Sequence, residues 1–329
     1  MDISIPSTAE ISAAHAALAA RAVRTPLVRW RGDRLARYIG SDTEVHLKLE
    51  LFQHTGTFKL RGALLGVAAL SPAEHARGVA AMSGGNHAIA VAYAAQQHRV
   101  SAKVVMPRTA SPVRRDLCAS YGAEVILADT IHECFARIET IAATEQRTII
   151  HPFEGRQIAL GTGTLGLEIH EQLSSADVVI VPVGGGGLAA GVACAIKQLN
   201  PRCRVYGIEP AGAPSMRQSL ERGEPVALSR TDTIADSLAS PCALPYSFAL
   251  CRQFLDGVEL VSDDELRRAM ALLYAEMKLA VEPAGAAATA GLLGPLNEAC
   301  KGKRVCVLVC GSNIDVELLA NHIKKAPAQ

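Results

Sequence analysis

Four consecutive glycines, Gly184, Gly185, Gly186 and Gly187, form the first segment of this sequence that could do chemistry. They follow an apolar run and precede an alanine-rich stretch, so a strand, a loop and a helix are expected in that order. Glycines let backbone N–H groups converge at a helix N-terminus, where phosphate binds. The same run fits a loose dinucleotide fingerprint with Glu209 at a ribose-binding spacing, so a nicotinamide enzyme is an alternative. A turn without a ligand is another.

A lysine that could act as a nucleophile lies in the segment 55–62, Thr-Gly-Thr-Phe-Lys-Leu-Arg-Gly. Lys59 follows a turn-forming Thr-Gly-Thr and stands next to the aromatic ring of Phe58. A lysine in a restricted, partly desolvated site has a lowered pKa and can form a Schiff base with a carbonyl. Considered alone, a lysine is more often a solvated surface charge.

Two further segments combine small residues with polar side chains after predicted strands. The first is Ser83, Gly84, Gly85, Asn86 and His87. It could bind a carboxylate through N–H groups at a helix start, or it could simply cap that helix. The second segment begins at Cys310 and, by itself, indicates a helix start with a buried thiol.

Alternating strand-like and helical runs must position these segments. Between 76 and 151, strands are expected at 78–82, 102–106, 124–127 and 148–150, with helices between them. A second series of buried strands is expected at 178–183, 203–208, 258–261 and 305–309. This order predicts an α/β protein of two domains, each an open, mostly parallel sheet flanked by helices. The predicted small domain covers 76–151, and the large domain covers 1–75 and 152–329. Ligands of such sheets bind at the carboxyl ends of the strands.

Composition narrows the classes of function. The 329 residues are 49% apolar and 20% charged, which excludes global disorder. With 33 basic and 32 acidic residues the net charge is +1, so nothing favours nucleic acid or a membrane surface. The longest uncharged run, 178–196, contains Pro182 and the glycines, so it is not expected to cross a membrane. Nine cysteines without a CxxC pair, and an N-terminus unlike a signal peptide, predict a reduced, cytoplasmic protein.

Together the four segments resemble those of the fold-type II pyridoxal-phosphate enzymes, in particular the serine/threonine dehydratase and serine racemase family. The resemblance extends from about residue 25 to residue 315 and implies a fold like that of the tryptophan synthase β subunit. It implies that Lys59 carries pyridoxal 5′-phosphate as a Schiff base and that Phe58 flanks the cofactor. Asn86 would then bind the ring oxygen, and the loop 83–87 would bind the substrate carboxylate. The four glycines would cradle the phosphate.

Three positions refine what the resemblance implies. Cys310 falls where the family contacts the pyridine nitrogen, and a neutral partner there suits elimination. Gly84 falls where racemases of the family carry a second serine that works as an acid and base, so a lyase is favoured over a racemase. Glu209 resembles the first ligand of a divalent cation in some members, but the next acidic ligand aligns with Ser215. No divalent metal is therefore predicted, with Glu209 a weak candidate ligand and a monovalent ion left open.

The resulting prediction is a pyridoxal-phosphate-dependent β-elimination on a β-hydroxy-α-amino acid that yields a 2-oxo acid and ammonia. Threonine or serine is the default substrate, and phenylserine or 3-hydroxyaspartate is equally compatible. An amino-acid racemase, an NAD-dependent oxidoreductase and a non-enzymatic amino-acid-binding module are the alternatives. The resemblance also implies a homodimer. The chain ends about where the catalytic core of the family ends, without a regulatory domain, so a catabolic role is expected.

Overall fold

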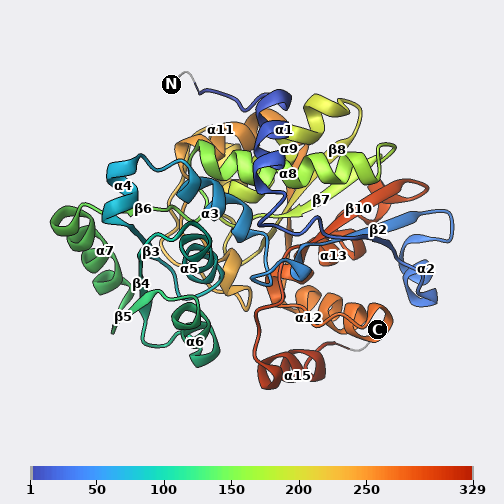
Figure 1. Ribbon diagram of the computed structural model, residues 1–329. Helices are drawn as coiled ribbons and strands as arrows, with labels where there is room; N and C mark the ends of the chain where they lie inside the picture. The colour runs from blue at the N-terminus through green and yellow to red at the C-terminus, as the bar shows by residue number, and fades with distance from the viewer. Residues whose placement is uncertain (1–2, 328–329) are drawn as a thin grey trace.

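Two β-sheets form the framework of the computed structural model, which describes residues 3–327 (Figure 1). The larger sheet has six strands in the order β1-β2-β10-β7-β8-β9. β1 pairs with β2 in antiparallel fashion, and the other neighbours are parallel. The strands are β1 (Leu27–Arg29), β2 (Glu44–Leu49), β7 (Val178–Pro182), β8 (Arg204–Pro210), β9 (Gly257–Val261) and β10 (Arg304–Val309).

The smaller sheet has four parallel strands in the order β5-β4-β3-β6. Its strands are β3 (Val79–Met82), β4 (Ala102–Pro107), β5 (Glu124–Ala128) and β6 (Thr148–Ile149). Three helices connect them, namely α5 (Asn86–His98), α6 (Pro112–Ser120) and α7 (Ile131–Glu145). α7 covers the outer side of this sheet, and α5 and α6 cover the side that faces the rest of the molecule (Figure 1). The α/β class with two mostly parallel sheets is confirmed. The domain limits at 76 and 151 stay a prediction, and they enclose this smaller sheet.

The eight strands expected from the sequence are present, each with ends within two residues of the expected ones. β1 and β2 were not expected. In β2 the apolar residues Val45, Leu47 and Leu49 alternate with polar ones and pack into the core of the larger sheet. Such alternation is a strand pattern, but it differs from the continuous apolar runs on which the prediction of the larger sheet was based. Lys48 is one of the polar residues of β2. It is fully buried, and its charge is compensated there by Glu168.

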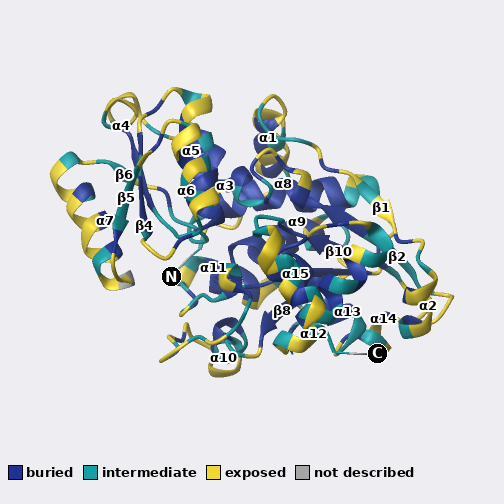
Figure 2. Cartoon of the chain, turned by 90° about the horizontal axis from the view of Figure 1, so that it is seen from below, coloured by how far each residue is buried: buried dark blue, intermediate teal, exposed yellow. Residues whose placement is uncertain are grey.

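Three helices run through the interior between the two sheets: α3 (Lys59–Ala68), α8 (Arg156–Gln172) and α9 (Gly187–Leu199). Figure 2 shows that all three are largely buried. α3 and α8 meet where both have a glycine, since a Cβ on Gly161 would lie 2.6 Å from the Cα of Gly62. Atoms do not approach so closely without a shift, so this contact requires glycine. The start of α3, with Lys59, is thereby held against α8.

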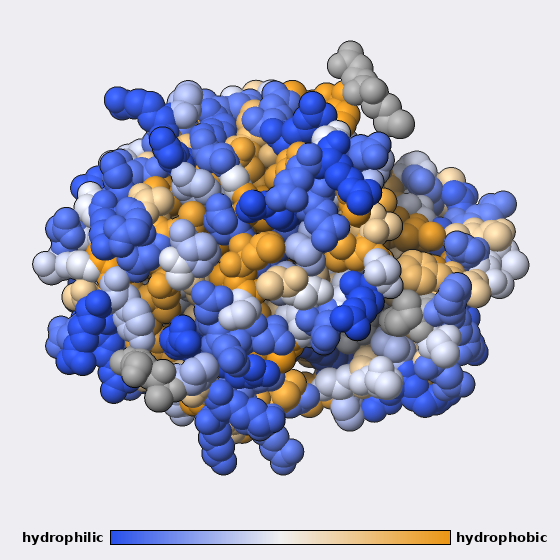
Figure 3. Space-filling view, turned by 180° about the vertical axis from the view of Figure 1, so that it is seen from behind, coloured by the Kyte–Doolittle hydropathy of each residue, from blue (hydrophilic) through white to orange (hydrophobic). Residues whose placement is uncertain are grey.

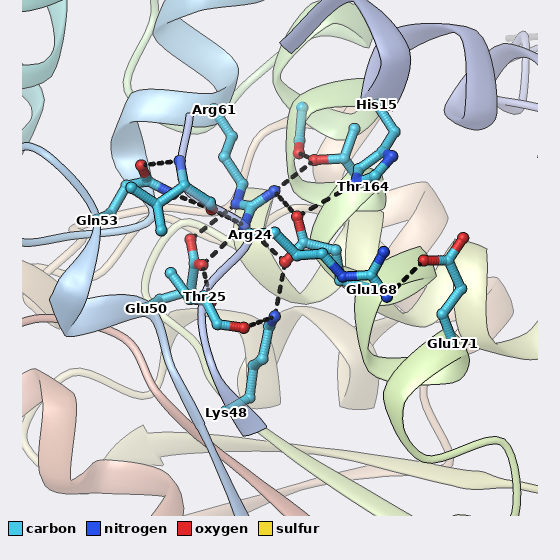
Figure 4. Close-up of polar contacts among 12 residues, drawn as sticks. His15, Arg24, Thr25, Lys48, Glu50, Gln53, Arg61, Thr164, Glu168 and Glu171 are labelled. Atoms are coloured by element: carbon cyan, nitrogen blue, oxygen red, sulfur yellow. Dashed lines mark hydrogen bonds and ion pairs between the residues drawn. The ribbon is translucent and has the colours of Figure 1, made fainter. Parts of the chain in front are cut away.

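A buried ionic cluster fixes the same helix to β2 and α8 (Figure 4). The guanidinium of Arg61 pairs with Glu50 and Glu168, each at 2.8 Å. The Lys48 amine donates to Glu168 at 2.6 Å and to the Thr25 carbonyl at 2.7 Å. Two cations thus face two carboxylates, and each side chain is at most 2% exposed. Buried charges are tolerated only when they are paired in this way.

The remaining helices lie around the two sheets and near the ends of the chain (Figure 1). They are α1 (Thr8–Leu18), α2 (Asp33–Ile39), η1 (Glu50–Phe52), α4 (Pro72–Arg77), α10 (Ser215–Arg222), η2 (Asp236–Leu238), α11 (Pro245–Phe254), α12 (Asp263–Leu272), η3 (Leu273–Met277), α13 (Pro283–Leu293), α14 (Asn297–Cys300) and α15 (Val316–Lys324). α1, α4 and α12 each begin with a serine capping box, from Ser7, Ser71 and Ser262. Such caps satisfy N–H groups that have no partner inside the helix.

The surface is mixed rather than dominated by one kind of side chain. Figure 3 shows a mainly hydrophilic face in which apolar residues form separate small groups. No helix among residues 3–327 has the length and apolar character needed to span a bilayer. All nine cysteines, which lie in the described part of the chain, are free thiols, and only Cys242 is not fully buried.

Candidate active site

Lys59 is the first residue of α3, at the edge where β10 ends. Phe58, which precedes it, donates its N–H to the Cys310 carbonyl at 3.2 Å, and Thr57 pairs with Gly311. The Lys59 amine donates to the Pro152 carbonyl at 2.6 Å and lies 5.1 Å from the centre of the Phe58 ring. Desolvation lowers the pKa of Lys59 to about 8, although Cys310 and Glu282 oppose the shift. Roughly a tenth of the amine is therefore neutral, and nucleophilic, at pH 7, far more than for an ordinary lysine.

The glycine loop between β7 and α9 turns its carbonyl groups into the protein. The carbonyl oxygens of Gly185, Gly186 and Gly187 accept hydrogen bonds from the side chains of Ser247, Cys251 and Thr162, respectively. Because N–H and C=O point in opposite directions across a trans peptide, the N–H groups that follow these carbonyls point the other way. These N–H groups lie at the N-terminus of α9, which favours an anion.

The segment 151–155 packs directly against this loop and was not identified from the sequence. A Cβ on Gly187 would lie 2.3 Å from the carbonyl oxygen of Phe153, and one on Gly185 would lie 2.4 Å from its ring. His151 holds the turn, since its Nδ1 accepts the N–H groups of Phe153 and Glu154. The loop, this turn and the Lys59 amine, which binds Pro152, are therefore parts of one site.

Asn86 begins α5 and faces the end of β10 across the space between the two sheets. Its amide donates to Glu282 Oε1 at 2.8 Å and to Ser237 Oγ at 3.2 Å. Its Oδ1 accepts from Asn313 at 2.8 Å. His87 next to it contacts the Ile150 carbonyl through Nε2 at 2.7 Å. Burial lowers the pKa of His87 to about 3, so this ring is neutral and its Nε2–H is the donor.

The rest of the loop 83–87 has little side-chain bulk. Ser83 Oγ accepts the N–H of Gly85 at 3.1 Å. Gly84 lies against Pro107, where an added Cβ would be 3.1 Å from the proline ring. The position thus carries no proton-transferring group.

Two ionisable residues of the site were missed in the sequence, Glu282 and Arg114. Glu282 immediately precedes α13 and is 1% exposed. Arg114, on α6, donates to Asp236 and to the Asn313 carbonyl, each at 2.8 Å, and its guanidinium lies beside Gly85. Before a Pro-Ala-Gly run Glu282 resembles an ordinary helix cap, and Arg114 resembles a surface charge, so no sequence signal distinguished them.

Cys310 lies at the end of β10, beside Lys59 and Glu282. Its thiol donates to the Ala284 carbonyl at 3.4 Å. Burial, followed by the neighbouring Glu282, raises the pKa of this thiol well above its ordinary value. The thiol is therefore neutral, in agreement with the electronic property expected from the sequence.

The candidate metal ligand Glu209 lies apart, at the end of β8. Both of its carboxylate oxygens accept backbone N–H groups at the start of α10, from Met216 and Arg217, each at 2.8 Å. Burial raises the pKa of Glu209 to about 8. Within residues 3–327 no three His, Cys, Asp or Glu side chains gather as a metal site would require. Ser215 is buried nearby without a hydrogen-bond partner for its hydroxyl.

These groups fit pyridoxal phosphate. An amine with a lowered pKa can bind the aldehyde, the glycine loop offers N–H groups to a phosphate, and a neutral thiol and an amide lie beside the amine. A Cβ in the glycine loop would collide with its surroundings, as expected of a backbone cradle. The individual roles of Lys59, Phe58, Asn86 and Cys310 stay predictions.

Comparisons with known proteins agree with this assignment. A sequence model of the family described as "Pyridoxal-phosphate dependent enzyme" matches residues 19–311. Phenylserine dehydratase of Ralstonia pickettii is 51% identical over 85% of this chain and 86% of that protein. L-threonine ammonia-lyase of Thermotoga maritima is 40% identical over 86% of this chain and 70% of its own length. The structure of maize serine racemase superposes with a TM-score of 0.90 at 32% identity, over 98% of both chains.

The chain belongs to the pyridoxal-phosphate-dependent enzymes. Within that family its relatives include dehydratases and ammonia-lyases, so the predicted fold-type II assignment, the cofactor and the lyase class are confirmed. The same comparison decides against the nicotinamide enzyme and against a binding module without catalysis. The loose dinucleotide fingerprint around Gly184 is therefore not evidence for a nicotinamide cofactor, and the phosphate-binding role of the glycine loop stays a prediction.

Adding one methyl group to the glycine loop should weaken cofactor binding. Gly187→Ala would force its Cβ against the Phe153 backbone, and such overpacking costs about 1–3 kcal/mol. We expect the dissociation constant for pyridoxal phosphate to rise roughly 10- to 100-fold, measured by titrating the apoprotein. Gly257→Ala is the control, because its Cβ would meet only Tyr206 ring atoms at 3.6 and 3.7 Å. Equal affinity in both variants would contradict the proposed cradle.

Proposed function

We propose that this enzyme dehydrates a β-hydroxy-α-amino acid whose side chain is uncharged and apolar, with phenylserine as the first candidate. The charge arrangement at the site carries the proposal. Arg114 is the cation beside the carboxylate-binding loop, and it is already bound to Asp236, with Glu282 3.9 Å away. A second carboxylate on the substrate would have to displace Asp236 from Arg114. The 51% identity with a phenylserine dehydratase supports the same choice.

Lys59 is proposed to perform both proton transfer and cofactor attachment. Bound pyridoxal phosphate supplies an aldehyde for amines and a conjugated ring that delocalises negative charge from the substrate Cα. The free Lys59 amine would remove the proton from Cα, and the proton it gains would balance the hydroxide that leaves Cβ as water. The pKa of about 8 suits this base, since proton transfer is most effective when pKa and working pH are close. The enamine that remains takes up water and yields a 2-oxo acid and ammonia.

The other site residues are proposed to bind the substrate and the cofactor and to set the charge on the cofactor ring. The N–H groups of the loop 83–87, at the start of α5, are proposed to hold the substrate carboxylate. Asn86 is proposed to bind the ring oxygen of the cofactor. The neutral Cys310 thiol leaves the pyridine nitrogen without an anionic partner, so charge is not retained on the ring and loss of the β-hydroxyl is favoured.

Racemisation is the weaker alternative, although serine racemases share the fold. A two-base racemase needs a second acid on the face opposite Lys59. The sequence resemblance assigns that role to position 84, which here is a glycine packed against Pro107. We therefore expect elimination to exceed racemisation.

Turnover of four substrates tests the proposal. DL-threo-phenylserine, L-threonine, L-serine and L-threo-3-hydroxyaspartate would be supplied separately, and the 2-oxo acid and ammonia quantified. We expect kcat/KM for phenylserine to exceed that for threonine at least about tenfold, which corresponds to roughly 1.4 kcal/mol. A preference for 3-hydroxyaspartate would refute the uncharged-substrate proposal. Formation of the opposite enantiomer of the amino acid without 2-oxo acid would show that the enzyme is a racemase and not a lyase.

We also propose a cytoplasmic homodimer. The free, buried cysteines suit a reducing compartment, and the dimer follows from the family resemblance alone. Light scattering on the purified holoenzyme measures the mass directly. A mass of one 34.6 kDa chain at micromolar concentration would rule the dimer out.

A further inference from the structure

Glu282 carries a buried carboxyl oxygen for which the site offers no partner. Its Oε1 accepts from Asn86, but Oε2 is fully buried and has no hydrogen bond from any residue in the described range 3–327. The nearest cationic nitrogen, on Arg114, lies 3.9 Å from Oε2, too far for a hydrogen bond. Leaving a buried polar atom unpaired costs about 1–3 kcal/mol, so such atoms mark places where a further group binds.

The groups that face Glu282 come from every surrounding element. α5 contributes Asn86, α6 contributes Arg114, η2 contributes Asp236, α3 contributes Lys59, and Cys310 lies at the end of β10. Arg114 donates its hydrogen bonds to Asp236 and to the Asn313 carbonyl, so it stabilises a negative charge on Glu282 only in part. The Lys59 amine is itself committed to the Pro152 carbonyl. The carboxyl group thus has one neutral amide partner and no close cation.

We propose that Glu282 is a cofactor-positioning residue, which fixes the Asn86 amide with one carboxyl oxygen and donates a hydrogen bond from the other to the pyridoxal ring. The proposal concerns the site and not the substrate, so it does not depend on phenylserine being the one used. It goes beyond the roles that the family resemblance assigns to Lys59, Asn86 and Cys310.

The protonation state of Glu282 agrees with its proposed role as a hydrogen-bond donor. Desolvation, followed by repulsion from Asp236, raises the pKa of Glu282 to about 8, although Arg114, Asn86 and Lys59 oppose the shift. A raised carboxyl pKa means that the proton is held below about pH 8 and lost above it. The donor is therefore present at neutral pH, and the cofactor should be held less well when the pH rises above 8. Lys59 also titrates near 8 in the free protein, so rates alone cannot separate the two groups.

Two substitutions distinguish the protonated acid from a carboxylate. Glu282→Gln keeps the shape and stays neutral, with an oxygen for Asn86 and an N–H₂ donor in place of the acid proton. Glu282→Ala removes both contacts. We expect Glu282→Gln to retain the cofactor affinity within about threefold, and Glu282→Ala to weaken it roughly 10- to 100-fold, as expected for one or two lost hydrogen bonds.

The measurements are made on apoprotein titrated with pyridoxal phosphate and on substrate-free holoenzyme scanned from pH 6 to 10. Wild-type absorption should change near pH 8, and Glu282→Gln should lack that change. Glu317→Gln, on the exposed part of α15, is the control and should behave as the wild type. If Glu282→Gln loses the cofactor as Glu282→Ala does, a carboxylate is required and the donor role is refuted. If both variants have the affinity and the spectra of the wild type, Glu282 has no role in binding the cofactor.

Discussion

Replacing Lys59 by alanine should lower kcat for every β-hydroxy amino acid by at least about 10³-fold and remove the near-visible band of the cofactor. The amine is the one group that both attaches the aldehyde and reaches the α-proton in the proposed mechanism. The ionisable neighbours Glu282 and Cys310 cannot form a Schiff base with the aldehyde, so neither replaces the amine. The assay is 2-oxo acid formation, with the absorption spectrum recorded on the same sample.

An exposed lysine provides the control for this substitution. Lys301 pairs with Glu298 on the surface, three residues away along the chain. Lys301→Ala should leave both turnover and spectrum unchanged. Circular dichroism should confirm that the Lys59 variant is folded. Activity of that variant within tenfold of the wild type would overturn the assignment.

Glu168→Gln should lower the free energy of unfolding by about 3–5 kcal/mol, the usual cost of breaking a buried ion pair from one side. Glu168 faces both Arg61 and Lys48, which together lower its pKa although burial opposes them. With glutamine at this position the two cations would share Glu50 alone, in the interior shown in Figure 4. Denaturant-induced unfolding of the holoenzyme, followed by circular dichroism, measures the change.

The same helix offers a matched control. Glu171 also lies on α8 but is 38% exposed at the side chain, and it pairs with Arg24 at 2.9 Å. Exposed pairs contribute about 0–1 kcal/mol, so Glu171→Gln should have an effect of that size. If both substitutions destabilise the protein equally, the buried cluster has no special role in holding α3.

Much of the framework was predictable because parallel strands buried on both faces are continuous apolar runs. Eight strands were predicted in this way, although the edge strands β5 and β6 are only partly buried. β2 was missed because its apolar residues alternate with polar ones, and the buried Lys48 among them is compatible with the core only through Glu168, 120 residues later. No local pattern can reveal such a distant partner. β1, with three residues at the sheet edge, has too little pattern of its own.

The site shows the same division. Lys59, Asn86 and the glycines stand at strand ends or helix starts in short motifs, so their neighbourhood could be inferred. Glu282 and Arg114 become site residues only because the fold brings their side chains within 3.9 Å of each other, from the residue before α13 and from α6. Their burial and their distance from each other depend on the tertiary structure, so they cannot be inferred from the local sequence around either residue.

The contact between α3 and α8 also bears on how this chain can change by mutation. At Gly62 and Gly161 the two backbones touch, and even the methyl group of alanine at position 161 would enter the α3 main chain. Such a change would move the first turn of α3, three residues from the Lys59 side chain, although neither glycine takes part in the chemistry. Mutations at positions outside the site can therefore displace the catalytic lysine. Variants at these two glycines should be among the rarest to survive selection for activity, while the exposed face of α7 should accept many.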